Sequence, residues 1–319
     1  MESAVKRIGV LTSGGDAPGM NAAIRAVVRT AMKNSIECVG IRRGWAGLIA
    51  GDICPMNSGS VSRIINRGGT ILYTARSDEF RTPEGQKKAA NTCKLLGLDG
   101  IVAIGGDGTF RGAQDLSRFG VSVVGVPGTI DNDIVCTDYT IGFDTAANTA
   151  VECIDRLRDT MQSHERCSVV EVMGRHAGYL ALYVGVAVGA TAVLVPEHQY
   201  DFEKHVAEKI RAARLGGKTN FMIVVAEGAA SAMDVGKEIK EHLGLDPRVT
   251  ILGHIQRGGS PTAKDRVLAT RMGYEAVRVL AEGMTNRVIC VRDDQIVNVD
   301  IDDGTGHEKR PSTPRNSRS

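Results

Sequence analysis

Two short apolar runs in the middle of the sequence each end in a turn that carries glycine and aspartate. Residues 101–104 lead into Gly-Gly-Asp-Gly-Thr at 105–109, and residues 123–126 lead into Pro-Gly-Thr-Ile-Asp-Asn-Asp at 127–133. Glycines bring backbone N–H groups close to an anion, and a helix predicted over 110–119 would add its N-terminus, where phosphate is favoured. Asp107 would repel a phosphate unless a divalent cation lay between them, so it indicates Mg²⁺.

A single Gly-Gly-Asp-Gly can also be a purely structural turn. Here two such turns follow adjacent predicted strands, and they hold three carboxylates, those of Asp107, Asp131 and Asp133. The carboxyl ends of parallel strands form the ligand-binding edge of an open sheet. The pair of turns therefore favours a phosphate-and-metal site.

A third turn of this kind opens the chain, after an apolar strand predicted at 8–11. Thr-Ser-Gly-Gly-Asp-Ala-Pro-Gly at 12–19 precedes a helix predicted at Met20–Lys33, and it matches neither a Walker A loop nor G-x-G-x-x-G. On that helix Arg25 and Arg29 are four residues apart, so they share a face and could hold one anion together. A solvated charged face explains them equally well.

Strands and helices alternate along the rest of the sequence. This alternation predicts an α/β protein of two doubly wound, Rossmann-like domains with mainly parallel sheets. Further strands are expected at 38–41, 167–172, 192–195, 221–226 and 249–252, further helices at 86–96, 148–162, 202–215 and from Ser260-Pro261 onward, and an irregular loop at 44–59.

The composition excludes several classes of protein. The 319 residues suffice for two domains, and a net charge of +2 argues against a general nucleic-acid or anionic-membrane surface. Residues 179–195 carry no charge, but they are short for a membrane span and are interrupted by glycines, so a buried helix leading into a strand is favoured. Seven cysteines without C-x-x-C spacing, and an N-terminus without the apolar core of a signal peptide, indicate reduced thiols in the cytoplasm.

Several cationic side chains in the second half fall at or near predicted strand ends. They are Arg166, Arg175, Arg248, His254 and Arg257, and Glu227 accompanies them. Arginines and a histidine suit a substrate that carries its own phosphate, and a glutamate suits sugar hydroxyls. Each could be an ordinary surface charge by itself. Together with three phosphate-type turns, they predict phosphoryl transfer from a nucleotide to a phosphorylated polyol.

Six motifs make the sequence resemble the bacterial ATP-dependent 6-phosphofructokinases. They are G-V-L-T-S-G-G-D-A-P-G-M-N-A, I-G-G-D-G-T, P-G-T-I-D-N-D, D-R-L-R-D-T, E-V-M-G-R and L-G-H-I-Q-R-G-G-S-P, and the match runs from about Arg7 to Asp303. The resemblance implies an ATP-binding domain (1–141 plus 255–303), a fructose 6-phosphate-binding domain (142–254) and a homotetramer. Residues 304–319 do not match, and their composition predicts a disordered tail.

The resemblance also implies a role for individual residues. Asp131 would be the base toward the sugar 1-hydroxyl, Asp133 and Arg175 would assist, and Thr129 would lie near the transferred phosphoryl group. Asp107 would hold Mg²⁺, and ATP would contact Gly15, Arg76, Ser77, Gly106, Asp107, Gly108 and Thr109. Fructose 6-phosphate would contact Thr129, Ile130, Asp131, Met173, Gly174, Arg175, Glu227, His254, Ile255, Gln256 and Arg257. Arg166 and Arg248 would reach in from a neighbouring subunit.

Two alternatives to an ATP-dependent kinase remain at this stage. Pyrophosphate-dependent relatives carry Asp where this chain has Gly108 and Lys where it has Gly128, so the glycines favour ATP. A non-catalytic regulatory subunit would be signalled by loss of Asp107 or Asp131, and both are present.

The pocket for allosteric effectors, which the resemblance implies binds ADP or phosphoenolpyruvate, matches only in part. Arg25, Arg29, Arg158, Gly189 and Lys218 match it, whereas Thr191 stands where the regulated relatives have an acidic residue. A hydroxyl is a weaker ligand for the cation that accompanies ADP. The sequence therefore predicts an altered response to ADP.

Overall fold

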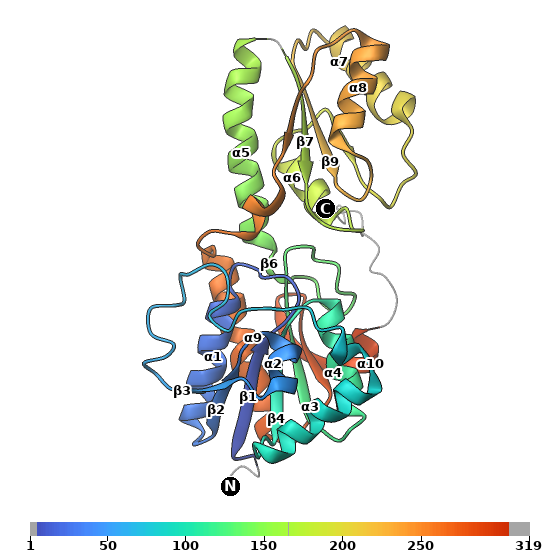
Figure 1. The fold of residues 1–319 in the computed structure, drawn as a ribbon. Coiled ribbons are helices and arrows are strands. Elements are labelled where there is room, and N and C mark those ends of the chain that lie inside the picture. Colours follow the sequence, from blue (N-terminus) through green and yellow to red (C-terminus); the bar gives the residue numbers. More distant parts are fainter. Residues whose placement is uncertain (1–4, 165, 306–319) are drawn as a thin grey trace. The chain divides into compact units, whose positions relative to one another are not determined.

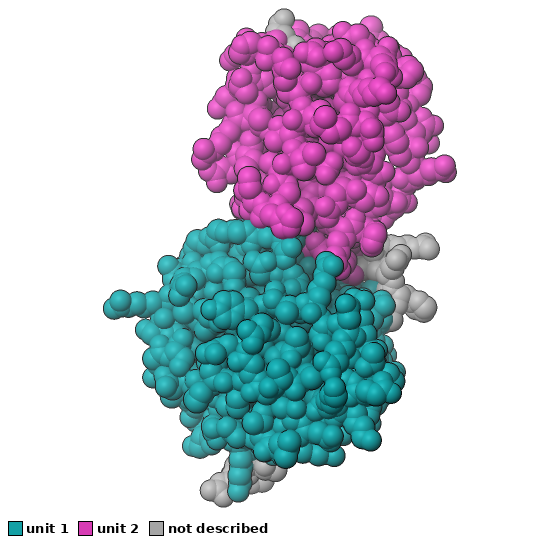
Figure 2. All heavy atoms as spheres, viewed as in Figure 1, with its two compact units in different colours: residues 1–130, 134–145, 257–308 teal, residues 131–133, 146–256, 309–319 magenta. Residues whose placement is uncertain are grey.

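The computed structural model describes residues 5–164 and 166–305, which form two compact units, coloured separately in Figure 2. Unit 1 comprises residues 5–130, 134–145 and 257–305, and unit 2 comprises 131–133 and the described part of 146–256. Each unit has its own sheet and its own apolar core. The predicted α/β class, with mainly parallel sheets, is confirmed.

The sheet of unit 1 has the strand order β12-β11-β5-β4-β1-β2-β3, with β6 beside β5. Its strands are β1 (Arg7–Thr12), β2 (Glu37–Ile41), β3 (Ile53–Met56), β4 (Gly100–Gly105), β5 (Val123–Thr129), β6 (Ile141–Gly142), β11 (Arg287–Arg292) and β12 (Gln295–Asp300). Only the edge pairs β2–β3 and β11–β12 are antiparallel. Because every residue of β4 is buried, helices must cover both faces of the sheet.

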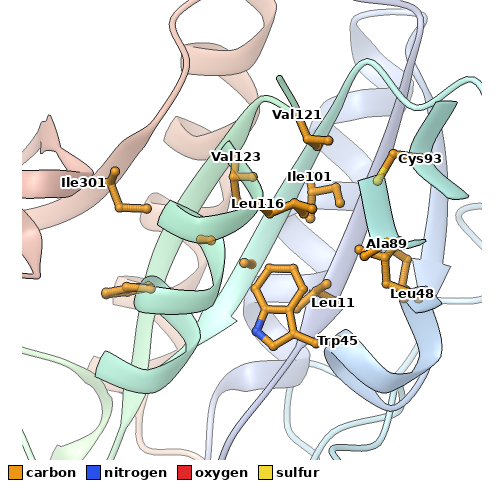
Figure 3. Packing of buried hydrophobic residues seen from close by; sticks show 14 of the residues in the cluster. Leu11, Trp45, Leu48, Ala89, Cys93, Ile101, Leu116, Val121, Val123 and Ile301 are labelled. Carbon is orange, nitrogen blue, oxygen red and sulfur yellow. The ribbon is translucent and has the colours of Figure 1, made fainter. Parts of the chain in front are cut away.

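The helices of unit 1 are α1 (Met20–Lys33), α2 (Gly44–Ala50), α3 (Pro83–Leu95), α4 (Asp107–Ser117), α9 (Ala263–Ala281) and α10 (Ile301–Gly304). They fall into two groups (Figure 1). Helices α1 and α9 pack against each other, and Gly273 allows this because a Cβ there would lie 2.8 Å from the Ala23 carbonyl oxygen. Figure 3 shows the other group, where Trp45 and Leu116 pack toward Ile101 of the sheet.

A buried carboxylate joins α9 to the strand β6 and the segment that follows it. Asp265 is fully buried, and it accepts hydrogen bonds from the Gly142 N–H at 2.9 Å, the Thr145 N–H at 2.9 Å and the Thr145 hydroxyl at 2.5 Å. Burial raises the pKa of the Asp265 carboxyl, while these hydrogen bonds oppose the rise. The carboxylate thus accepts hydrogen bonds from two backbone N–H groups and one hydroxyl in the interior.

Replacing Asp265 with alanine should destabilise the fold. The substitution leaves two backbone N–H groups buried without acceptors, so we expect the free energy of unfolding to fall by about 2–4 kcal/mol. Urea denaturation followed by circular dichroism measures it. Asp155→Ala, at an exposed position in α5 (Phe143–Ser163), is the matched control and should change stability by less than about 0.5 kcal/mol. Equal stability of the two variants would contradict the structural role of Asp265.

The sheet of unit 2 has the order β10-β7-β9-β8, and all its pairs are parallel. The strands are β7 (Cys167–Val172), β8 (Ala192–Leu194), β9 (Phe221–Ala226) and β10 (Arg248–Ile251). The helices are α5, α6 (Tyr179–Ala187), a π-helical turn η2 (Glu203–Ala207), α7 (Glu208–Leu215) and α8 (Ala232–Leu243), and a 3₁₀ turn η3 (Gly253–Arg257) follows β10. Val206, Ile210 and Ile239 pack with the strands into one apolar cluster.

Several predicted boundaries are corrected by the structure. The segment 44–59 is not an irregular loop, because it contains α2 and β3. The glycines and the proline of this segment make both elements hard to recognise from the sequence. Helix α4 begins at Asp107 rather than at residue 110, since an acidic residue in the first turn suits the helix dipole. Helix α9 begins at Ala263, capped by the Thr262 side chain and not by Ser260. Helix α5 begins at Phe143, five residues before the prediction, and 202–215 is divided between η2 and α7.

The end of the described chain is ordered further than predicted. Gly304, which the sequence assigned to a disordered tail, ends α10 and is buried, and a Cβ there would lie 3.0 Å from a methyl of Val288. Residues 306–319, the remainder of the predicted tail, lie outside the described residues.

The uncharged segment and the cysteines can be located in the structure. Residues 179–195 form α6, a turn with Gly189 at φ 58°, and β8; among the described helices none is both long and apolar enough to cross a membrane. The seven cysteines form no disulfide within the described part of the chain. Burial raises the pKa of Cys38, Cys93 and Cys167 to about 12, so these thiols stay protonated and unreactive at neutral pH.

Candidate active site

The glycine turns after β1 and β4 meet at the point where the strand order of unit 1 reverses. Strand β1 lies between β2 and β4, so the later strands extend the sheet first on one side of β1 and then on the other. Doubly wound proteins bind ligands at such a reversal of strand order. The Ser13 N–H donates to the Ile104 carbonyl at 3.0 Å, and the Thr109 hydroxyl donates to the Ser13 carbonyl at 3.1 Å. A Cβ on Gly105 would lie 2.5 Å from that Ser13 carbonyl oxygen. The two turns therefore pack closely into one surface, which we call the glycine floor (residues 12–19 and 105–109).

The N-terminus of α4 opens onto this floor. Gly106 is the N-cap and Asp107 the first helical residue, so the free N–H groups of the first turn can receive a phosphate. Apart from its chain neighbours and the backbone of α4, a Cβ on Gly108 would meet no atom of the described residues within 4 Å, so this position borders open space. Thr109, predicted to contact ATP, is 2% exposed, and its hydroxyl links the two turns.

Asp107 is the carboxylate predicted to hold Mg²⁺. Its Oδ2 lies 3.0 Å from a guanidinium nitrogen of Arg111, one helical turn later, and its side chain is 38% exposed. The described residues contain no group of three acidic, histidine or cysteine side chains that could hold a metal by themselves. Mg²⁺ commonly binds through one or two carboxylates plus substrate phosphates. A single accessible Asp107 beside a phosphate-binding helix end fits that mode.

Arg257 lies against the turn that follows β1. Its guanidinium donates to Asp16 Oδ1 at 2.8 Å and to the Asp16 carbonyl at 3.3 Å. A Cβ on Gly15 would lie only 2.4 Å from the same guanidinium. Thus Gly15, predicted to contact ATP, and Arg257, predicted to contact the sugar phosphate, are neighbours within unit 1.

The remaining predicted residues of unit 1 differ in accessibility. The carbonyl of Thr129, at the end of β5, accepts from the Thr140 hydroxyl at 2.6 Å, and its side chain lies near Gly106. Ile130 is 4% exposed, so it offers little surface to a substrate in this structure. Arg76 is exposed, and the Ser77 hydroxyl accepts from the Phe80 N–H at 3.2 Å, beside a 3₁₀ turn (Glu79–Arg81).

In unit 2 the turn after β7 carries Met173, Gly174 and Arg175. The Met173 N–H donates to Gln256 Oε1 at 2.9 Å, and the N–H groups of Gly174 and Arg175 both donate to Glu227 Oε1, at 3.2 and 2.8 Å. Arg175 Nε lies 3.9 Å from Asp131 Oδ2. Asp131 is 9% exposed, whereas the Arg175 side chain is 63% exposed. The predicted base and the predicted arginine therefore form a loose ion pair, and Asp133 follows two residues later, half-buried.

Other residues predicted to bind the sugar phosphate are exposed or paired within unit 2. His254 and Ile255 belong to η3, and Ile255 is 64% exposed. Arg248, at the start of β10, lies 3.4 Å from Asp246, and Arg166 immediately precedes β7, half-buried. Since Arg166 and Arg248 lie at the starts of their strands, they are at the opposite end of the sheet from the β7 turn.

The residues predicted for an effector pocket fall into two groups. In unit 1, Arg25 and Arg29 line a cavity of about 870 Å³. In unit 2, Arg158 donates to the Val188 carbonyl, next to Gly189, and Lys218 Nζ lies 3.3 Å from the Thr191 hydroxyl. Thr191 also accepts from the Met222 N–H at 3.3 Å, so its oxygen is already engaged.

Sequence reasoning missed three residues that shape the site. Asp16 holds Arg257, Arg111 pairs with Asp107, and Gly228 lies so close to the β7 turn that a Cβ there would be 2.1 Å from the Arg175 carbonyl oxygen. The four-residue spacing of Asp107 and Arg111 is a usable signal once the helix is known to begin at Asp107. The contacts of Asp16 and Gly228 depend on tertiary packing.

A glycine floor at a helix N-terminus in one doubly wound unit, and an arginine-bearing turn in a second, fit an α/β protein of the phosphoryl-transfer type. Residues 7–280 match the family model of phosphofructokinase, and the chain belongs to that family. It is 54% identical over 305 residues to the ATP-dependent 6-phosphofructokinase of Clostridium botulinum (Loch Maree), covering 96% of this chain and 95% of the relative. For the Clostridium tetani protein of the same name the identity is 56% over 297 residues, 93% of each chain. The crystal structure of Pichia pastoris phosphofructokinase in the T-state superposes with a TM-score of 0.89 at 35% identity, over 95% of this chain and 35% of that one.

Proposed function

We propose that this protein is an ATP-dependent 6-phosphofructokinase of glycolysis, which transfers the γ-phosphate of ATP to the 1-hydroxyl of fructose 6-phosphate. The observation that carries the proposal is the open space at Gly108 beside the phosphate-binding end of α4, because it leaves room for the α-phosphate of a nucleotide. The names of the clostridial relatives support the same donor. A coupled assay with Mg²⁺ and fructose 6-phosphate, run with ATP or with pyrophosphate, tests it; turnover with pyrophosphate alone would refute it.

The residues divide the chemistry between the two ligands. Unit 1 binds ATP through Gly15, the turn at 106–109 and Arg76, and unit 2 binds fructose 6-phosphate through the β7 turn, Glu227 and His254. When bound, Mg²⁺ at Asp107 neutralises charge on the ATP phosphates. Asp131 accepts the proton of the attacking hydroxyl, and Arg175 stabilises charge that develops on the transferred phosphoryl group. These interactions strengthen toward the transition state, which is what accelerates the reaction.

We propose a homotetramer with shared active sites because the family resemblance implies one, and the placement of Arg166 and Arg248 away from the β7 turn is compatible with it. Their guanidinium groups would complete the sugar-phosphate site of a neighbouring subunit. The chain would act in the cytoplasm, in keeping with cysteines that are free in the described part of the chain.

Mixing two inactive variants tests the shared site. Arg166→Ala and Asp131→Ser chains, exchanged into hybrid oligomers, should regain activity because some sites would contain neither substitution. The measurement is turnover before and after subunit exchange, with exchange verified by native mass spectrometry. Activity equal to the sum of the separate parents after complete exchange would contradict the shared site. Mixing Arg166→Ala with Arg248→Ala chains is the control, since under this scheme both substitutions impair the same contributed surface.

Allosteric regulation is proposed to persist in altered form, and the T-state of the Pichia pastoris enzyme supports an allosteric family. The Thr191 oxygen already accepts two hydrogen bonds and carries no charge, so it is a poor ligand for the cation that accompanies ADP. We expect Mg-ADP to shift the saturation curve for fructose 6-phosphate only weakly, since a smaller difference in affinity between two states gives a smaller shift. Thr191→Glu should strengthen the response. Strong activation of the unmodified protein by ADP would contradict this.

A further inference from the structure

We propose that Glu227, Gln256 and Gly228 form a clamp that holds the backbone of Met173, Gly174 and Arg175 and thereby aims the Arg175 guanidinium at the reacting phosphoryl group. The proposal deepens the proposed function, on which it rests. It makes Gln256 a positioning residue and gives Glu227 a second task besides any contact with the sugar.

The three N–H groups of the β7 turn are held by two side chains from neighbouring strand ends. The Gln256 side-chain oxygen accepts a hydrogen bond from the Met173 N–H. A single carboxylate oxygen of Glu227 accepts from the N–H groups of Gly174 and Arg175, at 3.2 and 2.8 Å. Within the turn, the Gly174 carbonyl accepts from the Ala177 N–H at 2.9 Å. The conformation of this turn therefore depends largely on side chains supplied from beyond the ends of β9 and β10.

The turn needs such support because its backbone is in unfavourable conformations. Arg175 has φ 54°, in the left-handed region that residues with a Cβ seldom adopt, and Gly174 has φ 144°. Such residues persist when their surroundings fix them, and they cluster at functional sites. Here the strained residue is the one whose guanidinium lies 3.9 Å from the carboxylate of Asp131.

Gly228, which follows β9, packs against the backbone of the β7 turn. A Cβ at this position would lie 2.1 Å from the Arg175 carbonyl oxygen and 3.4 Å from the Cα of His176. Both atoms belong to the backbone, so no side-chain rotation could relieve the overlap. The absence of a side chain at residue 228 is thus what allows the β9 turn to press against Arg175.

Gln256 can act only through the backbone in this arrangement. Its side chain is fully buried, so a substrate cannot reach it. The Met173 N–H requires an acceptor, which fixes which end of the amide faces the turn. The other end, Nε2, is buried and finds no partner among the described residues. The contact that the structure shows for this side chain is therefore the one that holds the Met173 N–H.

The test compares substitutions that remove the acceptor with one that keeps it. Glu227→Gln retains an oxygen that can accept from the N–H groups of Gly174 and Arg175, whereas Glu227→Ala does not. Gln256→Met keeps the side-chain volume but loses the acceptor of the Met173 N–H. Gly228→Ala introduces the overlap with the Arg175 carbonyl oxygen. Gly216→Ala is the control, since a methyl there meets only ordinary contacts, 3.4 Å at the nearest. Two quantities are measured: amide hydrogen exchange at residues 173–175 without substrate, and kcat with KM for fructose 6-phosphate.

We expect Glu227→Ala, Gln256→Met and Gly228→Ala to accelerate amide exchange in the turn by about tenfold or more and to lower kcat by about 10²-fold, the cost of misplacing a reacting group by an ångström. Glu227→Gln should keep wild-type exchange, because its amide oxygen can still accept from both N–H groups. Since Glu227 also contacts the sugar in the proposed function, this variant should raise KM for fructose 6-phosphate. Gly216→Ala should match the wild type in both measurements.

Glu227→Gln with kcat as low as that of Glu227→Ala and wild-type exchange in both would overturn the clamp, because Glu227 would then act by its charge alone. Unchanged exchange and kcat in Gly228→Ala and Gln256→Met would overturn it as well. If the wild-type chain did not phosphorylate fructose 6-phosphate, the proposed function would fail, while the exchange rates would still decide whether the clamp holds the turn.

Discussion

Asp131→Ser should lower kcat by about 10²–10⁴-fold while leaving the affinity for fructose 6-phosphate nearly unchanged. Removing a general base eliminates an interaction that is made as the hydroxyl loses its proton, which is in the transition state. Steady-state kinetics with saturating ATP gives kcat, and equilibrium binding of fructose 6-phosphate without ATP gives the affinity.

The control for this substitution is Asp155→Ser, which removes an exposed carboxylate of α5 and should leave kcat unchanged. The position of Asp131, 3.9 Å from Arg175, also predicts that the serine variant leaves the arginine less well oriented, so the loss can exceed that of proton transfer alone. A kcat within tenfold of wild type would exclude Asp131 as the base.

Gly108→Asp should reduce kcat/KM for ATP by about 100-fold or more without lowering stability. Apart from its chain neighbours and the backbone of α4, a Cβ at this position meets no atom of the described residues within 4 Å, and a carboxylate in the first turn of α4 suits the helix dipole, so the fold should tolerate it. The same carboxylate would occupy the space beside the phosphates and repel them, an effect worth several kcal/mol at short range when water is excluded. Kinetics in ATP and thermal denaturation give the two quantities.

Gly108→Asn is the matched control, because it has nearly the same size and no charge. We expect it to lose less activity than the aspartate variant, which separates crowding from repulsion. Pyrophosphate should be tried as donor with both variants. An ATP kcat/KM within about tenfold of wild type for Gly108→Asp would show that no phosphate lies near residue 108, and would weaken the argument for ATP.

The elements that can be predicted from the sequence are those whose signals are local. Helix α1 agrees with its prediction because its apolar face repeats with helical period between a glycine turn and a polar end. The glycine turns after β1 and β4 are recognisable for the same reason, and their meeting follows from the rule that ligands bind at the carboxyl edge of a parallel sheet. These signals require no knowledge of distant contacts.

What the sequence could not supply are the contacts between distant segments. Thr109 carries the residue type of a phosphate ligand, yet its hydroxyl is taken by the Ser13 carbonyl, 96 positions earlier. Gln256 matches a sugar-binding motif, yet its side-chain oxygen accepts from the Met173 N–H inside the protein. Helix α2 escapes prediction because glycines at 44 and 47 lower helix propensity, while burial of Trp45 and Leu48 in the core outweighs that loss.

The open space around Gly108 has a consequence for how donor preference could diverge among proteins with this fold. Substitutions at Gly105 collide with the backbone of the β1 turn, and those at Gly128 must displace side chains of Ile104 and Met20. Residue 108 has no such neighbours, so mutation there alters the ligand space without disturbing the protein. Single substitutions at residue 108 could therefore change the space next to the phosphoryl donor at little cost in stability, before any change at Gly128.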